Sequence, residues 1–416
     1  MENIFISNLS IKKVRHLKDI TIPLSKGTRK HLLITGKNGS GKTSLLEAIA
    51  GFLNAVSTSD DPMQAEHYLN LDKQNLEKQI ERNEPIQKVE ATKERIKSFQ
   101  MRIERAVCGL ELEMSQPLEM VRPAFEKGKF VIAYYRADRI FRAQIPKHVE
   151  KIELKEHYTI EEAPRENFVK YLLDLKMTEA LAATGGKSEK ADKIRGWFES
   201  LQVLLQRIFE DESLRLEFDE DTFQFWIHMS GREPFDFNTL SSGYAAVLDI
   251  VVDIILRMEK QTNRSFQFDM PGIVLIDEIE THLHLELQKR ILDLLTTIFP
   301  NIQFIVSTHS PFILSSLENT VIYDLENHVL VENGLADVPY EGIVEGYFKA
   351  DAMSHSLRQK YERYKQLVQK KTLTDEDLAE IAKLELFLDE IPDYLALDMT
   401  TEYKKKKLEF ESREDV

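Results

Sequence analysis

A glycine-rich loop at residues 36–44 has the composition and spacing needed to hold phosphate groups. The apolar residues 31–35 precede it and a helix pattern follows it, which is the context of a P-loop. Backbone N–H groups of such a loop surround the phosphates. Lys42 would reach the β- and γ-phosphates, and Thr43 would coordinate Mg²⁺. The predicted nucleotide-binding residues are Gly36, Lys37, Asn38, Gly39, Ser40, Gly41, Lys42, Thr43 and Ser44. The chemistry expected here is therefore binding of ATP with Mg²⁺.

A second candidate site follows the four apolar residues 273–276, where Asp277 and Glu278 stand next to each other. The apolar run predicts a buried strand with Asp277 at its carboxyl end, where open α/β sheets bind ligands. We expect Asp277 to hold Mg²⁺ through water, and Glu278 to be the general base that polarises an attacking water. Such a run is weak on its own, but its place after a P-loop predicts a Walker B strand.

Two shorter segments resemble motifs that distinguish ABC-type ATPases from other P-loop proteins. Leu-Ser-Ser-Gly-Tyr at residues 240–244, directly before a helix pattern, resembles the ABC signature. This resemblance implies that Ser241, Ser242 and Gly243 approach the γ-phosphate of ATP held by an opposite subunit. The apolar run 304–306 leads to His309, which resembles the switch histidine that contacts the γ-phosphate. Taken alone, Ser-Ser-Gly would be an ordinary helix cap, and a lone histidine is usually structural. All four motifs occur here in the order P-loop, signature, Walker B and switch histidine, so chance is a poor explanation.

The chain resembles the ABC-type ATPases related to the OLD, RecF and SMC/Rad50 proteins, over roughly residues 1–345. Asp277-Glu278-Ile-Glu280-Thr-His282-Leu-His284 and Ser-Thr-His309-Ser-Pro resemble the OLD-like branch in particular. That branch includes the ATPase subunits of Gabija-, Septu- and PARIS-type antiphage systems. The resemblance implies catalytic roles for Lys42, Glu278 and His309, and a homodimer that closes over two ATP molecules.

The sequence departs from the wider ABC pattern at two places. Tyr244 ends the signature where many relatives have Glu or Gln, and His284 stands where transporter ATPases carry an aspartate. Gln144 is the candidate for the glutamine of the Q-loop. His282 and His284 could be mistaken for a metal site, but residues two apart on a helix do not face each other. We assign both histidines to the subunit interface.

Composition restricts the class of protein. The chain has 416 residues, a formal net charge of −15, and Cys108 as its only cysteine. There is no apolar segment of about 20 residues that could span a bilayer, and no signal peptide pattern at the start. We therefore expect a cytoplasmic protein without a membrane partner, an intrachain disulfide or a cysteine metal site. An acidic chain does not favour wholesale coating of nucleic acid.

The patterns predict an α/β fold, an ABC-type ATPase head whose mixed, mainly parallel sheet has an antiparallel edge. Residues 1–63 would form an N-terminal lobe with the P-loop, and 106–345 the rest of the head, including a helical subdomain. Residues 64–105 have heptad-like apolar spacing broken at Pro85, which predicts a short helical hairpin. That hairpin is either a docking arm or a solvated insertion without a specific role. Residues 346–416 would be a helical C-terminal extension.

Several OLD-like relatives carry a C-terminal Toprim nuclease, but residues after 345 lack apolar strands that end in paired acids. We expect no nuclease domain in this chain. The leading hypothesis is an ATPase that acts as sensor or scaffold in a bacterial antiphage complex and controls a separate effector, such as a nuclease. The alternative is a RecF-like DNA-binding repair protein. Its local basic surface would come from Arg136, Arg139 and Arg142, within a basic stretch that also contains Lys147. A transporter subunit is a third, weaker possibility.

Overall fold

The computed structural model describes residues 4–57, 62–82, 84–144, 146, 148–338, 342–343, 355–370, 372–389 and 397–412. The chain separates into two compact units, Met1–Asp337 and Val338–Val416. The division falls a few residues before the predicted boundary between 345 and 346. Each unit is described by itself.

A six-stranded sheet with the order β11-β10-β3-β9-β8-β5 forms the centre of the first unit. All neighbouring strands are parallel except β11, which runs antiparallel to β10. Strands β3, β8, β9 and β10 are buried along their whole length, as expected for apolar strands covered on both faces. The strands are β3 (His31–Thr35), β5 (Val131–Tyr135), β8 (Gly272–Ile276), β9 (Ile302–Ser307), β10 (Thr320–Asp324) and β11 (Val329–Val331). The carboxyl ends of β3, β9 and β8 therefore meet at one edge of the sheet.

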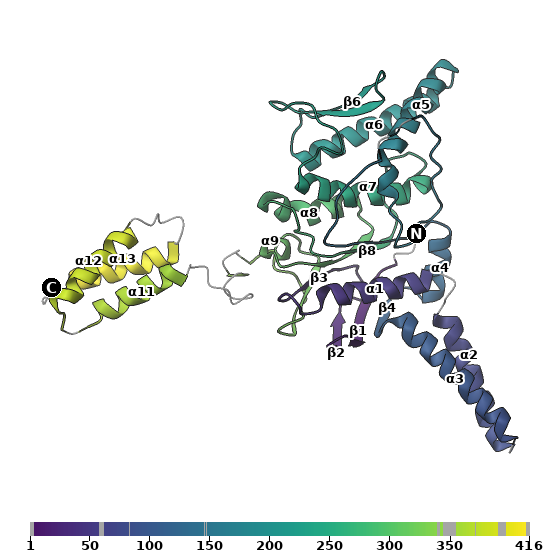
Figure 1. Ribbon diagram of the computed structural model, residues 1–416, viewed down its shortest axis with the longest axis horizontal. Coiled ribbons are helices and arrows are strands. Elements are labelled where there is room, and N and C mark those ends of the chain that lie inside the picture. The colour runs from purple at the N-terminus through teal and green to yellow at the C-terminus, as the bar shows by residue number, and fades with distance from the viewer. Residues whose placement is uncertain are drawn as a thin grey trace. The chain divides into compact units, whose positions relative to one another are not determined.

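A three-stranded antiparallel sheet and helix α1 (Lys42–Ser57) cover one face of the central sheet (Figure 1). The small sheet has the order β2-β1-β4. Apolar side chains from α1 and from both sheets form one continuous core. The elements on this side are β1 (Ile6–Val14), β2 (Leu17–Pro23), β4 (Leu110–Met114) and α4 (Leu118–Glu126).

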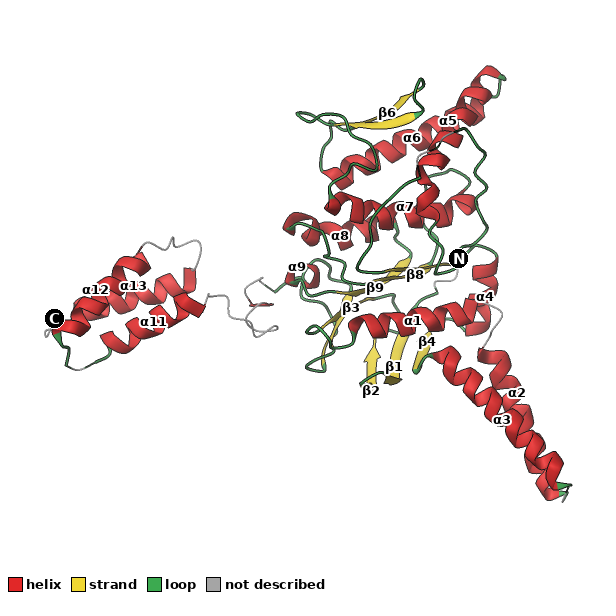
Figure 2. Cartoon of the chain, viewed as in Figure 1, coloured by secondary structure: helices red, strands yellow, loops and turns green. Residues whose placement is uncertain are grey.

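Helix α7 lies over the opposite face, and further helices and a two-stranded hairpin lie beside or beyond it (Figure 2). Helix α7 is buried on nearly every side from Ala245 to Glu259, which fits its almost unbroken apolar sequence. The elements on this side are η1 (Pro164–Asn167), α5 (Phe168–Thr184), α6 (Ser188–Phe209), β6 (Arg215–Asp219), β7 (Gln224–His228), α7 (Ser242–Thr262), α8 (Leu285–Ile298) and α9 (Pro311–Leu314).

Helices α2 (Pro62–Glu81) and α3 (Ile86–Val107) form the predicted hairpin, which projects from the body of the first unit (Figure 1). Asp72 and Arg95 form a two-pronged ion pair between the arms, at 3.0 and 3.1 Å. The seam is thus partly polar. Ile80, which the heptad spacing placed in the seam, is 56% exposed.

The second unit contains helices α11 (His355–Val368), α12 (Asp375–Asp389) and α13 (Leu397–Glu411). Their buried side chains form a separate core that includes Tyr364, Leu388 and Tyr403. The N-terminus of α12 is capped by Thr374, because the Asp377 N–H donates to the Thr374 hydroxyl at 3.2 Å.

The predicted fold class is confirmed: a mixed sheet core with an antiparallel edge, a helical hairpin and a helical C-terminal region. Within the described ranges, no helix combines the length and the apolar character needed to cross a membrane.

Candidate functional site

The P-loop connects β3 to α1 through backbone conformations that require glycine. Gly36 has φ +133°, and a Cβ there would lie 2.8 Å from the Ser40 hydroxyl. Gly39 and Gly41 also have positive φ values, of 84° and 100°. Helix α1 begins at Lys42, so its unpaired N–H groups point toward the loop. The loop is therefore shaped as an anion cradle at a helix N-terminus.

Lys42 is buried in this cradle, with 6% of its surface exposed. Its ammonium donates to the carbonyl oxygens of Gly36 and Lys37, at 2.9 and 3.3 Å. Thr43 and the loop residues Lys37, Asn38 and Gly39 are exposed, while Ser40, Gly41 and Ser44 are half-buried. The Lys42 ammonium thus already lies on the inner side of the loop, and the Thr43 hydroxyl is open to solvent.

Asp277 and Glu278 follow β8 in a turn that β9 holds in place. The Ser307 hydroxyl, at the end of β9, accepts from the Glu278 N–H at 2.7 Å. The same hydroxyl donates to the Asp277 carboxylate. Asp277 is 3% exposed, whereas Glu278 is half-buried and has a left-handed φ of 44°. Both carboxylates therefore lie at the carboxyl edge of the sheet with a fixed backbone between them.

His309 lies two residues after β9, at the same edge. Its main-chain N–H donates to the Glu280 carboxylate. Its Nε2 atom is buried and has no hydrogen-bond partner in the described chain. Burial and the positive charge of Lys42 lower the pKa of His309, while Glu280, Glu278 and Asp277 raise it. A buried, unpartnered ring nitrogen at this edge is available for a ligand.

The electrostatics of Lys42 link the P-loop to the acidic turn. Burial lowers the pKa of Lys42, and the carboxylates of Glu278, Asp277 and Glu280 act in the opposite direction. The strand order β3-β9-β8 places the P-loop, the acidic turn and the segment of His309 at one edge of the sheet, so they belong to one site. The structure thus brings together the predicted residues of the P-loop, of the Walker B turn and of the switch histidine.

The signature residues lie elsewhere. Ser241 and Ser242 are exposed at the start of α7, and the Ser241 side chain makes no capping hydrogen bond. A Cβ on Gly243 would lie 3.0 Å from the carbonyl oxygen of His282. Within the described ranges, no hydrogen bond, ion pair or ring contact joins these three residues to the P-loop of the same chain.

Tyr244 and His284, the two departures from the ABC pattern, contact each other. Their rings make an edge-on contact with 6.2 Å between centroids, and Tyr244 also stacks on Phe209 at 4.3 Å. His284 caps α8, since its Nδ1 accepts from the Leu287 N–H. The unusual residue types thus form one local packing unit between α7 and α8.

The prediction of a basic surface is wrong for Arg139. This side chain is 5% exposed, and its guanidinium donates to main-chain carbonyls of the Walker B turn. Arg136 and Arg142 are exposed, and Lys147 lies outside the described residues. Gln144, the Q-loop candidate, is exposed, and its main-chain N–H donates to the Glu166 carbonyl at 2.9 Å.

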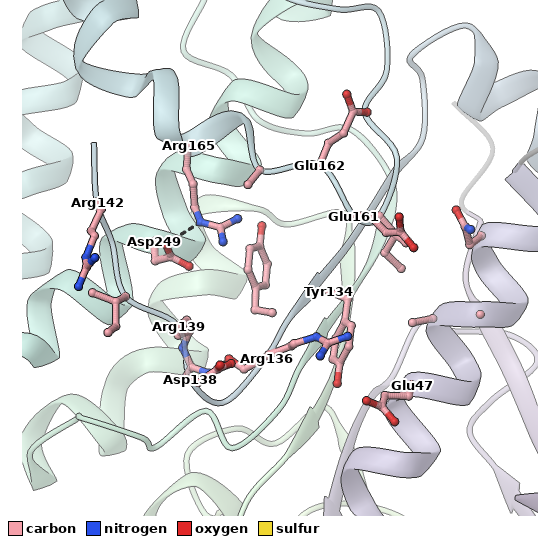
Figure 3. A pocket seen from close by; sticks show the side chains of 17 residues that line it. Glu47, Tyr134, Arg136, Asp138, Arg139, Arg142, Glu161, Glu162, Arg165 and Asp249 are labelled. Carbon is pink, nitrogen blue, oxygen red and sulfur yellow. Dashed lines mark hydrogen bonds and ion pairs between the residues drawn. The ribbon is translucent and has the colours of Figure 1, made fainter. Parts of the chain in front are cut away.

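Arg139 also lines a cavity of about 790 Å³ beside the site (Figure 3). None of residues 36–44 lines this cavity, so it is distinct from the phosphate cradle. Arg165 pairs there with the buried Asp249 of α7 at 2.6 Å, while Glu47 comes from α1. The cavity is therefore lined by elements that cover opposite faces of the central sheet.

The possible metal ligands, Thr43 and Asp277, fit Mg²⁺ better than a metal whose ligands all come from the protein. Mg²⁺ is usually bound by one or two carboxylates together with substrate phosphates. Asp277 and Thr43 supply a carboxylate and a hydroxyl at the edge of the sheet. Across the part of the chain that the structure describes, no cluster of three His, Cys, Asp or Glu residues could hold a metal ion.

Sequence reasoning missed Ser307, Glu280 as a partner of His309, and Glu326. Ser307 stands within the same segment as His309, so its position after a buried strand was a usable signal. Glu326, which follows β10, accepts from the Lys37 N–H at 3.3 Å and pairs with its ammonium at 2.6 Å. No motif marks Glu326, because only the pairing of β10 with β3 brings it to the P-loop.

Two family models match the chain. One is described as an AAA ATPase domain and matches residues 5–179; the other, described as "AAA domain, putative AbiEii toxin, Type IV TA system", matches residues 160–315. Together they cover the P-loop, the signature, the Walker B turn and the switch histidine. The chain thus carries AAA/ABC-type ATPase domain sequence.

The chain is homologous to Septu and retron ATPase proteins. It is 27% identical over 335 residues to the Septu protein PtuA of Bacillus mycoides (strain KBAB4), covering 79% of this chain and 41% of that protein. It is 42% identical over 89 residues to the Retron Ec83 probable ATPase of Escherichia coli, covering 21% of this chain and 16% of that protein. This chain therefore spans about two fifths of the length of the first relative and less of the second.

Solved structures of SMC heads are also similar. The SMC head bound to the C-winged helix domain of ScpA matches 80% of this chain and 100% of its own, with a TM-score of 0.39 and 15% identity. The SMC head domain from Thermotoga maritima matches 77% of this chain and 94% of its own, with a TM-score of 0.35 and 12% identity.

Proposed function

We propose that this chain is a Mg²⁺-dependent ATPase that closes as a homodimer over two ATP molecules and controls a separate effector in antiphage defence. The observation that carries the ATPase proposal is the meeting of Lys42, Asp277, Glu278 and His309 at the carboxyl edge of β3, β9 and β8. This edge is where open α/β sheets place their ligands.

Each residue has a role that follows from its chemistry and position. The P-loop N–H groups and Lys42 would bind and neutralise the phosphates, since Lys42 would exchange its two carbonyl partners for phosphate oxygens. Glu278 would accept a proton from the water that attacks the γ-phosphorus, and the bond to the ADP oxygen would break. His309 would donate from its unpartnered Nε2 to the transferring phosphoryl group.

Thr43 and Asp277 would hold Mg²⁺, which would supply positive charge to offset the negative charge that develops on the phosphates. The buried Asp277 carboxylate keeps its orientation because the Ser307 hydroxyl donates to it. Ser241, Ser242 and Gly243 would complete the site from the second protomer, in line with the exposure of both serines.

The defence role is supported by the homology to Septu and retron proteins. The sequence resembles ATPase subunits of such systems. We infer that cleavage activity belongs to a separate effector, and that the hairpin α2–α3 or the C-terminal helices dock it. The cytoplasm is the expected location.

The test is capture from the native host. Tagged Glu278→Gln protein is purified with ATP and Mg²⁺, and the co-eluting molecules are identified, with Lys42→Ala as matched control. We expect a stoichiometric protein with nuclease features to co-elute with Glu278→Gln. Less of this protein should co-elute with Lys42→Ala. DNA without a protein partner would instead support the repair alternative, and no ATP-dependent partner would contradict the defence proposal.

A further inference from the structure

The side chain of Arg139 contacts the turn that carries Glu278. One terminal nitrogen of its guanidinium donates to the carbonyl oxygens of Asp277 and Arg136, at 2.8 and 3.1 Å. The other donates to the carbonyl oxygens of Glu278 and Ile279, at 3.1 and 2.8 Å. One side chain thus holds three consecutive carbonyl groups of the Walker B turn.

This turn needs an external support. Glu278 has a left-handed φ of 44°, a conformation that is unfavourable for a residue with a Cβ. Residues 277–279 follow the end of β8, so the strand ladder does not satisfy their carbonyl groups; the Glu278 carbonyl also accepts from the Thr281 N–H at 2.9 Å. A planar guanidinium offers five donors in a fixed fork, whereas a lysine ammonium offers three on a flexible stem. Arg139 is therefore suited to fix this backbone, and a lysine is not.

The charge of Arg139 fits the same purpose. Burial lowers the pKa of Arg139, and the carboxylates of Asp249, Glu280, Asp277 and Glu278 raise it. The positive charge thus lies among the acids of the turn and the buried Asp249 of α7. Figure 3 shows Arg139 in the cavity wall, below the pair formed by Arg165 and Asp249. Its hydrogen bonds to residues 277–279 place Arg139 beside the turn that carries Glu278.

We propose that Arg139 is a positioning residue for hydrolysis, which holds the Walker B turn so that the Glu278 carboxylate is aligned with the attacking water. It acts through the main chain of residues 277–279 and contributes nothing to ATP binding. This inference rests on the proposed ATPase function. It also explains why an arginine in a stretch that resembles a basic surface is buried.

The first test separates turnover from binding. Arg139→Met removes every donor, Arg139→Lys keeps the charge, and Arg136→Met is the matched control, because Arg136 is exposed on the same loop. We expect kcat to fall about 10–100-fold in both Arg139 variants, since small misplacements of a catalytic group have effects of this size. The dissociation constant of a fluorescent ATP analogue should stay within about twofold of wild type. Arg136→Met should match wild type in both.

A second test distinguishes positioning from mere structural support. In Arg139→Ala, added methylguanidine should restore kcat in a saturable way at temperatures well below the melting temperature of the variant. If Arg139→Met does not fold, the kcat of Arg139→Lys and the rescue of Arg139→Ala by methylguanidine test the proposal. The proposal would be overturned if the Arg139 variants kept a kcat within twofold of wild type. It would also be overturned if they lost ATP binding as strongly as they lost kcat. An inactive wild-type protein would instead overturn the ATPase function itself.

Discussion

Ser307 fixes Glu278 through a hydrogen bond of 2.7 Å, in which the Glu278 N–H donates to the Ser307 hydroxyl. The two residues come from the ends of neighbouring parallel strands, β9 and β8. The same hydroxyl donates to Asp277, so a single buried serine orders both acids of the turn. Arg139 supports that turn from the carbonyl side, and Ser307 supports it from the N–H side.

The change Ser307→Ala should therefore weaken both the fold and the reaction. It leaves the Glu278 N–H and one Asp277 oxygen without their partner, which costs about 1–3 kcal/mol when such groups are buried. We expect a lower melting temperature and a kcat reduced about tenfold or more. Thermal melts and steady-state ATPase assays measure both.

Ser316→Ala is the matched control for this prediction. The Ser316 hydroxyl donates to the Ile313 carbonyl at 2.8 Å, away from the acidic turn. It should alter kcat by less than twofold. An equal effect of both changes on kcat would show that Ser307 has no special role in the site.

The change Ser241→Arg should prevent ATP-dependent dimerisation without unfolding the chain. Ser241 is exposed and makes no side-chain cap, so a long side chain there disturbs little within one protomer. In the proposed dimer it would collide with the ATP of the partner. Sedimentation in the Glu278→Gln background should show dimerisation weakened at least tenfold, or about 1.4 kcal/mol.

Ser188→Arg, at the exposed start of α6, is the control for Ser241→Arg. It should dimerise with ATP like the parent protein. If Ser241→Arg also dimerises like the parent protein, the signature does not face ATP across the dimer, and the proposed assembly is wrong.

His31 should make stability depend on pH below neutrality. It is 5% exposed at the start of the P-loop strand, and its Nδ1 accepts from the Phe304 N–H at 3.0 Å. Burial, with a smaller effect of Arg29, lowers the pKa of His31 to about 4. At pH above 6.5 the ring is neutral whether the chain is folded or not, so it contributes no pH dependence there. As the pH falls from 6.5 toward 4, only the unfolded chain takes up a proton, and about 3 kcal/mol of stability is lost.

The variant His31→Asn isolates this effect. Its amide oxygen can still accept from the Phe304 N–H, but it does not titrate. Melting temperatures of wild type and variant are compared between pH 7.5 and 5. The wild type should lose more stability than His31→Asn over this range; parallel curves would show that His31 is not the source.

Local motifs explain how much of the site the sequence could predict. The P-loop at 36–44 and the acids 277–278 are contiguous, and each stands next to an unbroken apolar run. Because buried parallel strands end at one edge, their meeting in space followed from the pattern alone. The fold class and the hairpin α2–α3 followed in the same way, from apolar periodicity and from the break at Pro85.

The rest depends on partners that are distant in the chain. Arg139 lies in a stretch with other arginines. Its burial becomes evident only from its hydrogen bonds to Asp277 and Glu278, which are 138 and 139 positions away in the sequence. The contact of Tyr244 with His284 and the ion pair of Asp72 with Arg95 likewise need the three-dimensional arrangement. Charged residues are usually exposed, so a sequence pattern gives no sign of these exceptions.

The measurement that tests the central claim most directly is ATP hydrolysis and ATP binding by purified wild-type, Lys42→Ala and Glu278→Gln proteins with Mg²⁺. Wild type should hydrolyse ATP, and Lys42→Ala should neither bind nor hydrolyse it. Glu278→Gln should bind ATP and remain dimeric while its turnover falls at least about 100-fold, as expected when a general base is removed. Hydrolysis by Glu278→Gln at the wild-type rate, or by Lys42→Ala, would contradict this assignment of the site.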